Sequence, residues 1–337
     1  VYKRQVLGGA LFTIGARLII ESGGTAGQAY AFESIGAFIG GLLFSFILVY
    51  LFDPYQVAVM LALINTGVAA YIVLHVQTFS GPALPILALF AAVFIILVVI
   101  FLAGPNINSK TLELQYENLV FAKDSPYGRV AIQANNGQRV FYQNGLLTFE
   151  TQGVFSEEVV HLPLLAHPDP KFVLLVGGGI AGNVREILKQ PVHHITYVEI
   201  DPYLIEAANE YLPQEDIIAL NDPRVELVLT DGRNFIKQAA EQIKSGKRQP
   251  FDVVLLDLPE PSTGSLNRFY TLEFFQEIKA ILSENGVLET GIPSAENYLS
   301  QELVRRNGSI YKTLKYVFPE IVVTPGEYNF LIASNEK

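Results

Sequence analysis

The feature of this sequence that most constrains its fold is a long stretch without charged residues: from Pro54 through Ser109 there is no Asp, Glu, Lys or Arg. Three apolar segments lie in and just before this stretch, at residues 29–52, 54–76 and 82–104. Each offers about 20 apolar residues, the length needed to cross the hydrocarbon core of a bilayer. Helices in the core of soluble proteins are seldom this long without a charge. We therefore predict a transmembrane helical region over residues 1–106, with three spans in the lipid bilayer.

The beginning of the chain indicates that an N-terminal part is missing. The first residue is Val rather than Met, and residues 6–20, VLGGALFTIGARLII, have the composition of the end of an earlier span. We therefore expect a truncated N-terminus ahead of the three spans.

The formal charge is confined to the remainder of the chain. Residues 1–109 contain three basic and three acidic residues, so the net charge of −10 belongs entirely to the residues after 109. An acidic part without a basic stripe argues against nucleic-acid binding and suits a cationic ligand. The sequence has no cysteine, which excludes disulfides, thiolate metal ligands and cysteine nucleophiles. We predict no metal site.

Two different patterns follow the apolar region. Residues 111–150 alternate apolar and polar side chains, with turn signals at Asp124-Ser125-Pro126, Asn135-Asn136-Gly137 and Asn144-Gly145. This pattern is typical of an antiparallel meander, and we predict a small β-strand domain over residues 107–165. HLPLLAHPDP then leads into the second pattern as a connection.

Short apolar runs alternate with helical stretches over residues 166–337. The seven runs are FVLLV, HITYVEI, VELVLT, FDVVLLD, NGVLETGI, EIVVT and NFLIAS. Alternation of strands and helices predicts a parallel sheet with helices on both faces, and the tight TPGEYN turn predicts a final antiparallel hairpin. The expected fold class is therefore an α-helical transmembrane segment followed by α/β, with a small antiparallel β domain and a Rossmann-like seven-stranded sheet of the methyltransferase type.

Polar residues collect where the predicted parallel strands end, which is where such sheets bind ligands. Glycines there let the backbone approach a ligand, and carboxylates can accept hydrogen bonds from ribose and adenine. The candidates for nucleoside binding are Gly177, Gly179, Glu199, Asp231 and Gly232, and Asp257 follows the fourth strand. A strand-end aspartate that only caps the next helix is the alternative for each acid. This alternative is strongest for Asp201, which precedes Pro202.

Three segments carry a resemblance to a known family. GGGIAGNVREILKQPVHHITYVEIDPYLIEAANEYL, DPRVELVLTDGRNFI and FDVVLLDLPEPS together resemble the spermidine synthase (polyamine aminopropyltransferase) family. The apolar spans make the chain similar to the membrane-embedded bacterial members of that group. The resemblance implies transfer of an aminopropyl group to a polyamine or other amine. Decarboxylated S-adenosylmethionine would be the co-substrate, and no cofactor would be bound permanently.

The resemblance also implies roles for individual residues. Glu199 would hold the ribose of the donor, and Asp231 with Gly232 would hold its adenine. Asp257 would accept the proton of the attacking amine. The acceptor would be bound by Glu260, Tyr270 and Glu157. Prolines 259 and 261 would stiffen the turn so that Asp257 and Glu260 face one cationic substrate.

The amine end of the expected site departs from the family pattern at three positions. Ile180 stands where the family has an Asp, Ser156 falls within its Tyr-His pair, and Gly128 replaces an early Gln. Each lost contact to a charged amine would cost about 1.5–3 kcal/mol. The nucleoside-binding residues are therefore better preserved than the amine-binding residues.

Two other functions remain open from the sequence. The first is an S-adenosylmethionine-dependent methyltransferase on the same fold. The second is a transporter or sensor that binds a nucleoside or a polyamine without turnover. For any of them we expect a multi-pass protein of the inner or plasma membrane with its soluble domain in the cytoplasm, because the adenosyl donor is made in the cytosol. The resemblance allows a homodimer.

Overall fold

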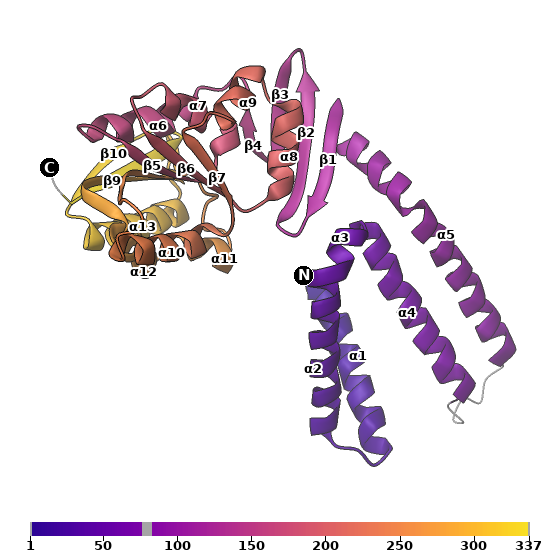
Figure 1. Cartoon of the computed structure of the whole chain (residues 1–337). Coiled ribbons are helices and arrows are strands. Elements are labelled where there is room, and N and C mark those ends of the chain that lie inside the picture. The colour runs from indigo at the N-terminus through magenta and orange to yellow at the C-terminus, as the bar shows by residue number, and fades with distance from the viewer. Residues whose placement is uncertain (1, 76–82, 336–337) are drawn as a thin grey trace. The chain divides into compact units, whose positions relative to one another are not determined.

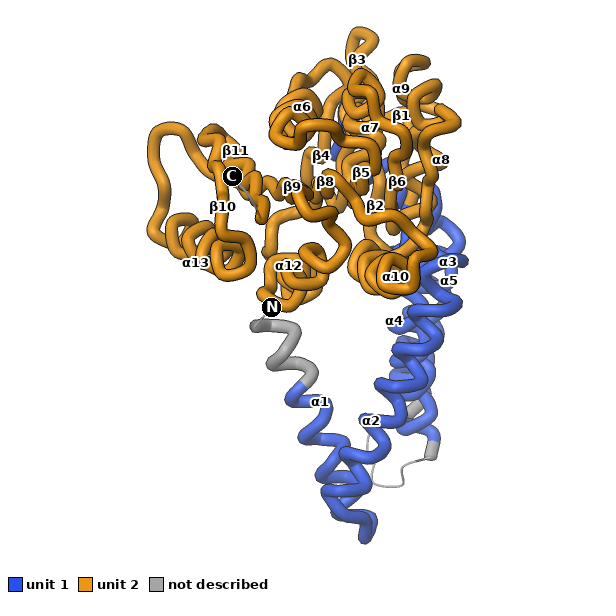
Figure 2. The backbone as a smooth tube through the Cα atoms, turned by 60° about the vertical axis from the view of Figure 1, so that its left-hand side comes forward, with its two compact units in different colours: residues 1–117, 124–126 blue, residues 118–123, 127–337 orange. Residues whose placement is uncertain are grey.

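The computed structural model describes residues 2–75 and 83–335. The chain forms two compact units, one of residues 1–117 with 124–126 and one of residues 118–123 with 127–337 (Figure 2). Some predicted spans and domains begin or end at residues outside the described ones, namely Val1, Val76, Pro82 and Lys337.

The first unit is helical, and most of its large apolar side chains are exposed. Its helices are α1 (Tyr2–Glu21), α2 (Ala26–Leu43), the π-helix η1 (Phe44–Leu48), α3 (Val49–Leu51), α4 (Pro54–His75) and α5 (Ala83–Gln115) (Figure 1). Three continuous helical segments are long and apolar enough to cross a membrane, namely Ala26–Leu51, Pro54–Leu74 and Leu84–Gln115. They are candidate spans by length and composition.

Polar residues at the ends of these helices are satisfied locally. Thr25 and Gln28 form a reciprocal capping box at the start of α2. At the start of α4, Asp53 Oδ1 accepts from the Gln56 amide at 2.8 Å, and Gln56 Oε1 accepts from the Asp53 amide at 3.3 Å. Such pairs satisfy free N–H groups of a first helical turn. The amides of Asp53 and Gln56 therefore both have acceptors at the sharp turn before Pro54.

Helix α5 is longer than the sequence predicted. It contains Pro105 and continues to Gln115, so TLELQ, which alternates like a strand, is helical. Leu112 of α5 is buried, and so is Tyr116 directly after the helix, whose amide donates to the carbonyl of Leu112 at 2.8 Å. Residues four apart share one face of a helix, and this spacing competes with the two-residue alternation that suggested a strand.

The small antiparallel sheet is confirmed. Its order is β1-β2-β3-β4, with β1 at Leu119–Ser125, β2 at Gly128–Asn135, β3 at Gln138–Gln143 and β4 at Leu146–Glu150. Asn136 and Gly137 have φ of 47° and 87°, and Asn144 and Gly145 have φ of 53° and 80°. Two successive residues with positive φ make the two-residue hairpin turn that Asn-Gly favours.

The seven-stranded sheet is also confirmed, in the order β10-β11-β9-β8-β5-β6-β7. Its strands are β5 (Phe172–Val176), β6 (His194–Glu199), β7 (Val225–Leu229), β8 (Phe251–Leu256), β9 (Leu282–Pro293), β10 (Glu320–Thr324) and β11 (Tyr328–Ser334). Strands β5 to β9 pair in parallel, and β11 lies antiparallel between β9 and β10. The chain therefore has a Rossmann-like mixed sheet beside a small antiparallel one.

Helices cover both faces of this sheet (Figure 1). One face packs against α10 (Gly232–Lys244), α12 (Leu272–Lys279) and α13 (Gln301–Val317). The other packs against α6 (Phe155–Ala166), α7 (Asn183–Leu188) and α9 (Gln214–Leu220). Helix α8 (Pro202–Tyr211) packs against the small sheet, and α11 (Gly264–Asn267) and the 3-10 turn η2 (Gly179–Ala181) complete the unit.

Helix α6 replaces much of the connection that HLPLLAHPDP suggested. The helix includes Pro163, but Val160 and Leu164 are buried four residues apart against the sheet. This spacing is the signature of one apolar helix face. The prediction of a connection here did not take that spacing into account.

Candidate active site

The glycine loop after β5 lies against the end of β8. Gly177 and Gly178 have φ of 76° and 65°, a region that side chains other than glycine rarely adopt. A Cβ on Gly177 would overlap the backbone oxygen of Asp257, and a Cβ on Gly178 would overlap its carboxylate. A Cβ on Gly179 would overlap the ring of Tyr197. The two predicted nucleoside-binding glycines and the predicted proton acceptor therefore lie together.

Glu199 is buried at the end of β6, with 6% of its surface exposed. Its Oε2 accepts from the Tyr197 hydroxyl at 2.9 Å, and its Oε1 accepts from the amides of Ile200 and Asp201 at 2.8 and 3.1 Å. Burial raises the pKa of Glu199, and these hydrogen bonds oppose the shift. A carboxylate offers about four acceptor positions, so capacity remains for a hydroxyl group of a ligand.

Asp201 is a helix cap, as its position before Pro202 predicted. Its side chain accepts from the amide of Tyr203 at 3.0 Å. This is the normal role of an aspartate at the N-cap, the residue directly before the first helical one.

Asp231 and Gly232 lie after β7, where α10 begins. Asp231 Oδ1 accepts from the Asn234 amide at 3.0 Å and caps the helix, while Oδ2 pairs with Arg268. A Cβ on Gly232 would lie 2.5 Å from Val176 Cγ1. Gly232 thus lets the first turn of α10 pack closely on β5, and the carboxylate of Asp231 has structural partners on both oxygens.

Asp257 is partly buried directly after β8. Asn183 Nδ2 donates to its Oδ2 at 2.8 Å. Burial raises the pKa of Asp257, and the hydrogen bond from Asn183 opposes the shift. A carboxylate with a raised pKa is a stronger base than an exposed one, which suits a group that must accept a proton.

The predicted amine-binding residues have different surroundings. Glu260 Oε2 lies 2.6 Å from Arg306 Nη1. Tyr270 is buried and donates its hydroxyl to the carbonyl of Pro259 at 3.1 Å. Burial raises the pKa of Tyr270, and the carboxylates of Glu289 and Asp257 raise it further. Glu157 is exposed on the first turn of α6. The structure therefore places Tyr270 near Asp257, pairs Glu260 with an arginine and exposes Glu157.

The three departures from the family pattern bring no charge to this region. Ile180 is buried in an apolar cluster with Leu204 of α8. Ser156 is buried, and its Oγ lies 3.2 Å from where a Cβ of Gly182 would be. Gly128 has a φ of 141° beside Asn144.

A small cavity of about 20 Å³ lies beside Asp257. It is lined by residues of α6, β9 and β11, of the end of β8 and of the segment after β8, namely Phe155, Val159, Leu256, Asp257, Leu258, Glu289, Gly291, Tyr328 and Phe330. Glu289 and Tyr328 were not among the predicted site residues. The lone acid in the apolar run NGVLETGI was a signal that could have identified Glu289.

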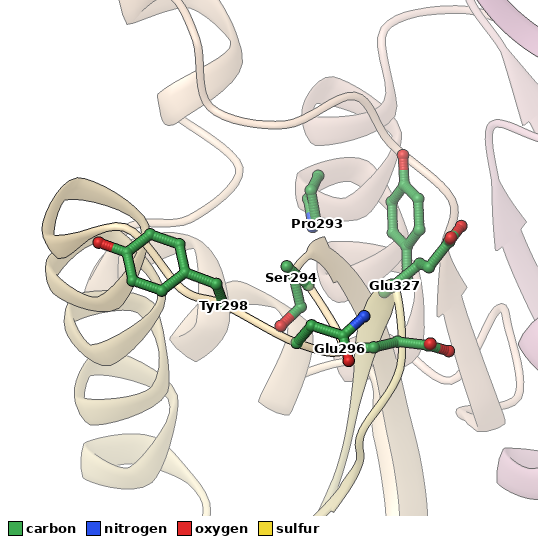
Figure 3. A pocket seen from close by; sticks show the side chains of 8 residues that line it. Pro293, Ser294, Glu296, Tyr298 and Glu327 are labelled. Atoms are coloured by element: carbon green, nitrogen blue, oxygen red, sulfur yellow. The ribbon is translucent and has the colours of Figure 1, made fainter.

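An open pocket of about 460 Å³ adjoins this cavity through Tyr328, which lines both. Its other lining residues come from the segment after β9 and the turn before β11: Pro293, Ser294, Ala295, Glu296, Asn297, Tyr298 and Glu327. Tyr298 lies at one side of this pocket and Glu327 at the other (Figure 3). The two glutamates make the pocket acidic.

Sequence reasoning also missed four residues that hold the predicted ones in place: Asn183, Tyr197, Arg268 and Arg306. Tyr197 could have been identified, because it shares a strand face with Glu199 two residues later. The two arginines come from distant parts of the sequence, and no local pattern indicates them.

Comparisons with known proteins agree with this geometry. The profile of the family described as "Spermine/spermidine synthase domain" matches residues 152–336. A polyamine aminopropyltransferase of Thermoanaerobacter sp. (strain X514) is 33% identical over 227 residues, covering 65% of this chain and 78% of the relative. One from Shouchella clausii is 37% identical over 176 residues, covering 52% of this chain and 58% of the relative.

Solved structures give the same result. A spermidine synthase in complex with the transition state analogue AdoDATO aligns with a TM-score of 0.56 and 27% identity, covering 65% of this chain and 74% of the other. The spermidine synthase of Thermotoga maritima aligns with a TM-score of 0.55 and 26% identity, covering 65% of this chain and 73% of the other.

Proposed function

The chain belongs to the spermine/spermidine synthase family and is a transferase of the aminopropyltransferase type, and we propose that it is a membrane-anchored member. It transfers an aminopropyl group from decarboxylated S-adenosylmethionine to an amine acceptor. The observation that carries this proposal is the contact between the glycine loop and Asp257, with Glu199 close by through Tyr197. Nucleoside-binding groups and a base with a raised pKa thus meet at adjoining strand ends.

The donor half of the site is formed by β5, β6 and β7. Gly177 and Gly179 let the backbone approach the donor, and Glu199 accepts a ribose hydroxyl with its remaining lone pair. Asp231 and Gly232 lie where the adenine would bind. Asp231 already caps α10 and pairs with Arg268. It would bind adenine through the carboxylate lone pairs that these two contacts do not use.

The transfer step needs one base. The nitrogen of the acceptor attacks the donor's aminopropyl carbon next to the sulfonium, and the carbon–sulfur bond breaks with its electron pair remaining on sulfur. Methylthioadenosine leaves, and the nitrogen loses a proton to Asp257. Asn183 holds the Asp257 carboxylate in place through a hydrogen bond of 2.8 Å. The remaining rate acceleration comes from the alignment of nitrogen, carbon and sulfur. Glu260, Tyr270 and Glu157 remain the proposed acceptor-binding residues.

The three apolar helical segments support a location in the inner or plasma membrane. The small sheet at residues 119–150 and the nucleoside-binding part around the seven-stranded sheet would then lie in the cytoplasm. The exposed apolar side chains of the helical segments need lipid or a partner to cover them. A homodimer is part of the same proposal.

The test is Asp257→Asn in the full chain purified in detergent. Turnover of decarboxylated S-adenosylmethionine with putrescine is expected to fall by about 10²- to 10⁴-fold, while calorimetry shows donor binding retained. Asp169→Asn is the matched control, because Asp169 is exposed. A methylated product from S-adenosylmethionine would favour the methyltransferase alternative. Ligand binding without any product from the wild-type chain would favour the transporter or sensor.

A further inference from the structure

Glu289 is a buried carboxylate in the large sheet. It lies on β9, opposite Leu255 of β8 and Ile332 of β11, and only 1% of its surface is exposed. Among the residues that the structure describes, no side chain hydrogen-bonds to either of its oxygens, and the backbone amide of Leu256 is close enough to lower its pKa. Buried acids are normally paired, so this one needs an explanation.

The space in front of Glu289 is formed by small and aromatic residues. A Cβ on Gly291 would lie 3.8 Å from Glu289 Oε1 and 3.4 Å from the ring of Phe330, so the missing side chain leaves the carboxylate accessible from the cavity. Phe155 lies edge-on to Tyr328 at 5.2 Å and close to Phe330 at 5.6 Å. The cavity thus has aromatic walls, and both Asp257 and Glu289 line it.

This combination matches one kind of ligand group. The cavity volume of about 20 Å³ is close to the space that one water molecule occupies, and a primary ammonium group is of similar size. Aromatic faces attract cations, and carboxylates make strong hydrogen bonds to ammonium. No basic side chain among the described residues forms an ion pair with Glu289, so a cation that pairs with it would come from a ligand.

We propose that Glu289 is a substrate-binding residue that pairs with a primary ammonium group of the acceptor amine in this cavity, which Asp257 also lines. The proposal rests on the proposed aminopropyl transfer and identifies the acceptor as an unbranched primary amine. In this proposal the carboxylate that binds the amine lies on β9. Ile180, in the glycine loop, is apolar and buried where the family has an Asp.

The first experiment measures acceptor binding separately from turnover. Putrescine is titrated calorimetrically into the full chain in detergent with methylthioadenosine present. Glu289→Gln is expected to weaken putrescine binding by about ten- to a hundredfold, the value of a charged hydrogen bond, and to leave methylthioadenosine binding unchanged. Glu284→Gln is the control, because Glu284 is exposed on the same strand. Wild-type affinity for putrescine in Glu289→Gln overturns the proposal.

A second probe tests the size of the cavity at constant charge. N,N,N′,N′-Tetramethylputrescine carries the same two charges, but each of its ammonium groups exceeds the cavity volume. It is expected to bind the wild-type chain at least about tenfold more weakly than putrescine, the effect of excluding a misfitting group. Equal affinity, or no binding of putrescine at all, overturns the proposal.

Kinetics separates this inference from the proposed function. Glu289→Gln is expected to raise the KM for putrescine and leave the KM for the donor unchanged, a split that a merely structural residue does not produce. A wild-type chain that binds putrescine through Glu289 but forms no aminopropyl product contradicts the proposed function alone. A chain with full turnover and an unaffected Glu289→Gln variant contradicts the Glu289 assignment alone.

Discussion

At the scale of single residues, the three central carboxylates differ in how well they are satisfied. Glu199 accepts three hydrogen bonds, Asp257 accepts one from Asn183, and Glu289 accepts none from a side chain among the described residues. The free energy of a buried acid depends on such contacts, because an unmade hydrogen bond leaves the desolvation cost uncompensated. The satisfied carboxylate suits a neutral sugar, and the unsatisfied one suits a cation.

We expect Glu289→Leu to stabilise the empty protein. Removing an unpartnered buried acid avoids about 1–3 kcal/mol of desolvation cost, so the apparent unfolding temperature of the full chain in detergent should rise. Glu284→Leu, at an exposed position, should leave it nearly unchanged. A fall of several degrees for Glu289→Leu would show that the carboxylate has a structural partner.

The same residue predicts how stability depends on pH. Burial raises the pKa of Glu289 well above its usual value, and the charge of Asp257 raises it further. The folded state therefore holds a proton that the unfolded chain loses above about pH 4.5, and stability falls as pH rises from there through the raised pKa. Unfolding temperatures measured from about pH 5 to 8 should fall less in Glu289→Leu than in the wild type. Parallel profiles would contradict this assignment.

The glycine loop should not accept a side chain. Gly178→Ala introduces a Cβ at a φ of 65° into the carboxylate of Asp257, and the backbone conformation alone costs about 1–2 kcal/mol. We expect lower stability and weaker methylthioadenosine binding by calorimetry. Gly308→Ala in α13 is the control: no atom lies within 4 Å of its added Cβ, and alanine in a helix interior should stabilise by about 0.5–1 kcal/mol. Equal stability of the two variants would refute the prediction.

At the scale of elements, a residue at the end of a helix or strand can both stabilise that element and bind a ligand. Asp231 shows this most clearly, because it caps α10 and also lies at the predicted adenine position. Asp231→Ala should cost about 0.5–2 kcal/mol through loss of the cap, whereas Asp231→Ser should keep most of it. If Asp231 binds adenine, both variants should weaken methylthioadenosine binding. Intact binding in Asp231→Ser would leave the residue a structural role only.

The sequence predicted those elements whose signals are local. The Asn-Gly turns defined the meander, and the apolar runs defined all seven strands of the large sheet. It failed for α6 and for the end of α5, where Pro163 and Pro105 lie within helices. Proline disfavours a helix interior, but packing of one apolar face can outweigh that preference. Local patterns cannot reveal this balance.

The candidate site was predicted unevenly for the same reason. Gly177, Gly179 and Asp257 follow strands directly, so their proximity could be expected from sheet topology alone. The partners Arg268 and Arg306 come from other elements, and their contacts depend on the three-dimensional packing. Glu289 belongs to a strand that its apolar neighbours identify as buried, and only the structure shows that no side chain within residues 2–75 and 83–335 pairs with it.

At the scale of the whole molecule, the distribution of charge indicates that one part of the chain lies in a bilayer and the other in water. The candidate spans carry exposed apolar side chains, and the net charge of −10 lies on the residues after 109. We expect the full chain to remain in the membrane fraction after an alkaline carbonate wash, because each span offers about 20 apolar residues to the bilayer. Release into the supernatant would contradict the proposed anchoring. A reporter fused after Lys337 that is active only outside the cytoplasm would contradict the proposed orientation.

The insertion of β11 between β9 and β10 has a consequence for biosynthesis. Tyr328 and Phe330, which β11 contributes, are the last residues in the chain to line the cavity beside Asp257. A ribosome makes the glycine loop, Glu199 and Asp231 well before it reaches them. A nascent chain can thus form the proposed nucleoside-binding half first, and β11 adds its part of the cavity wall only after the five parallel strands β5 to β9 have been made.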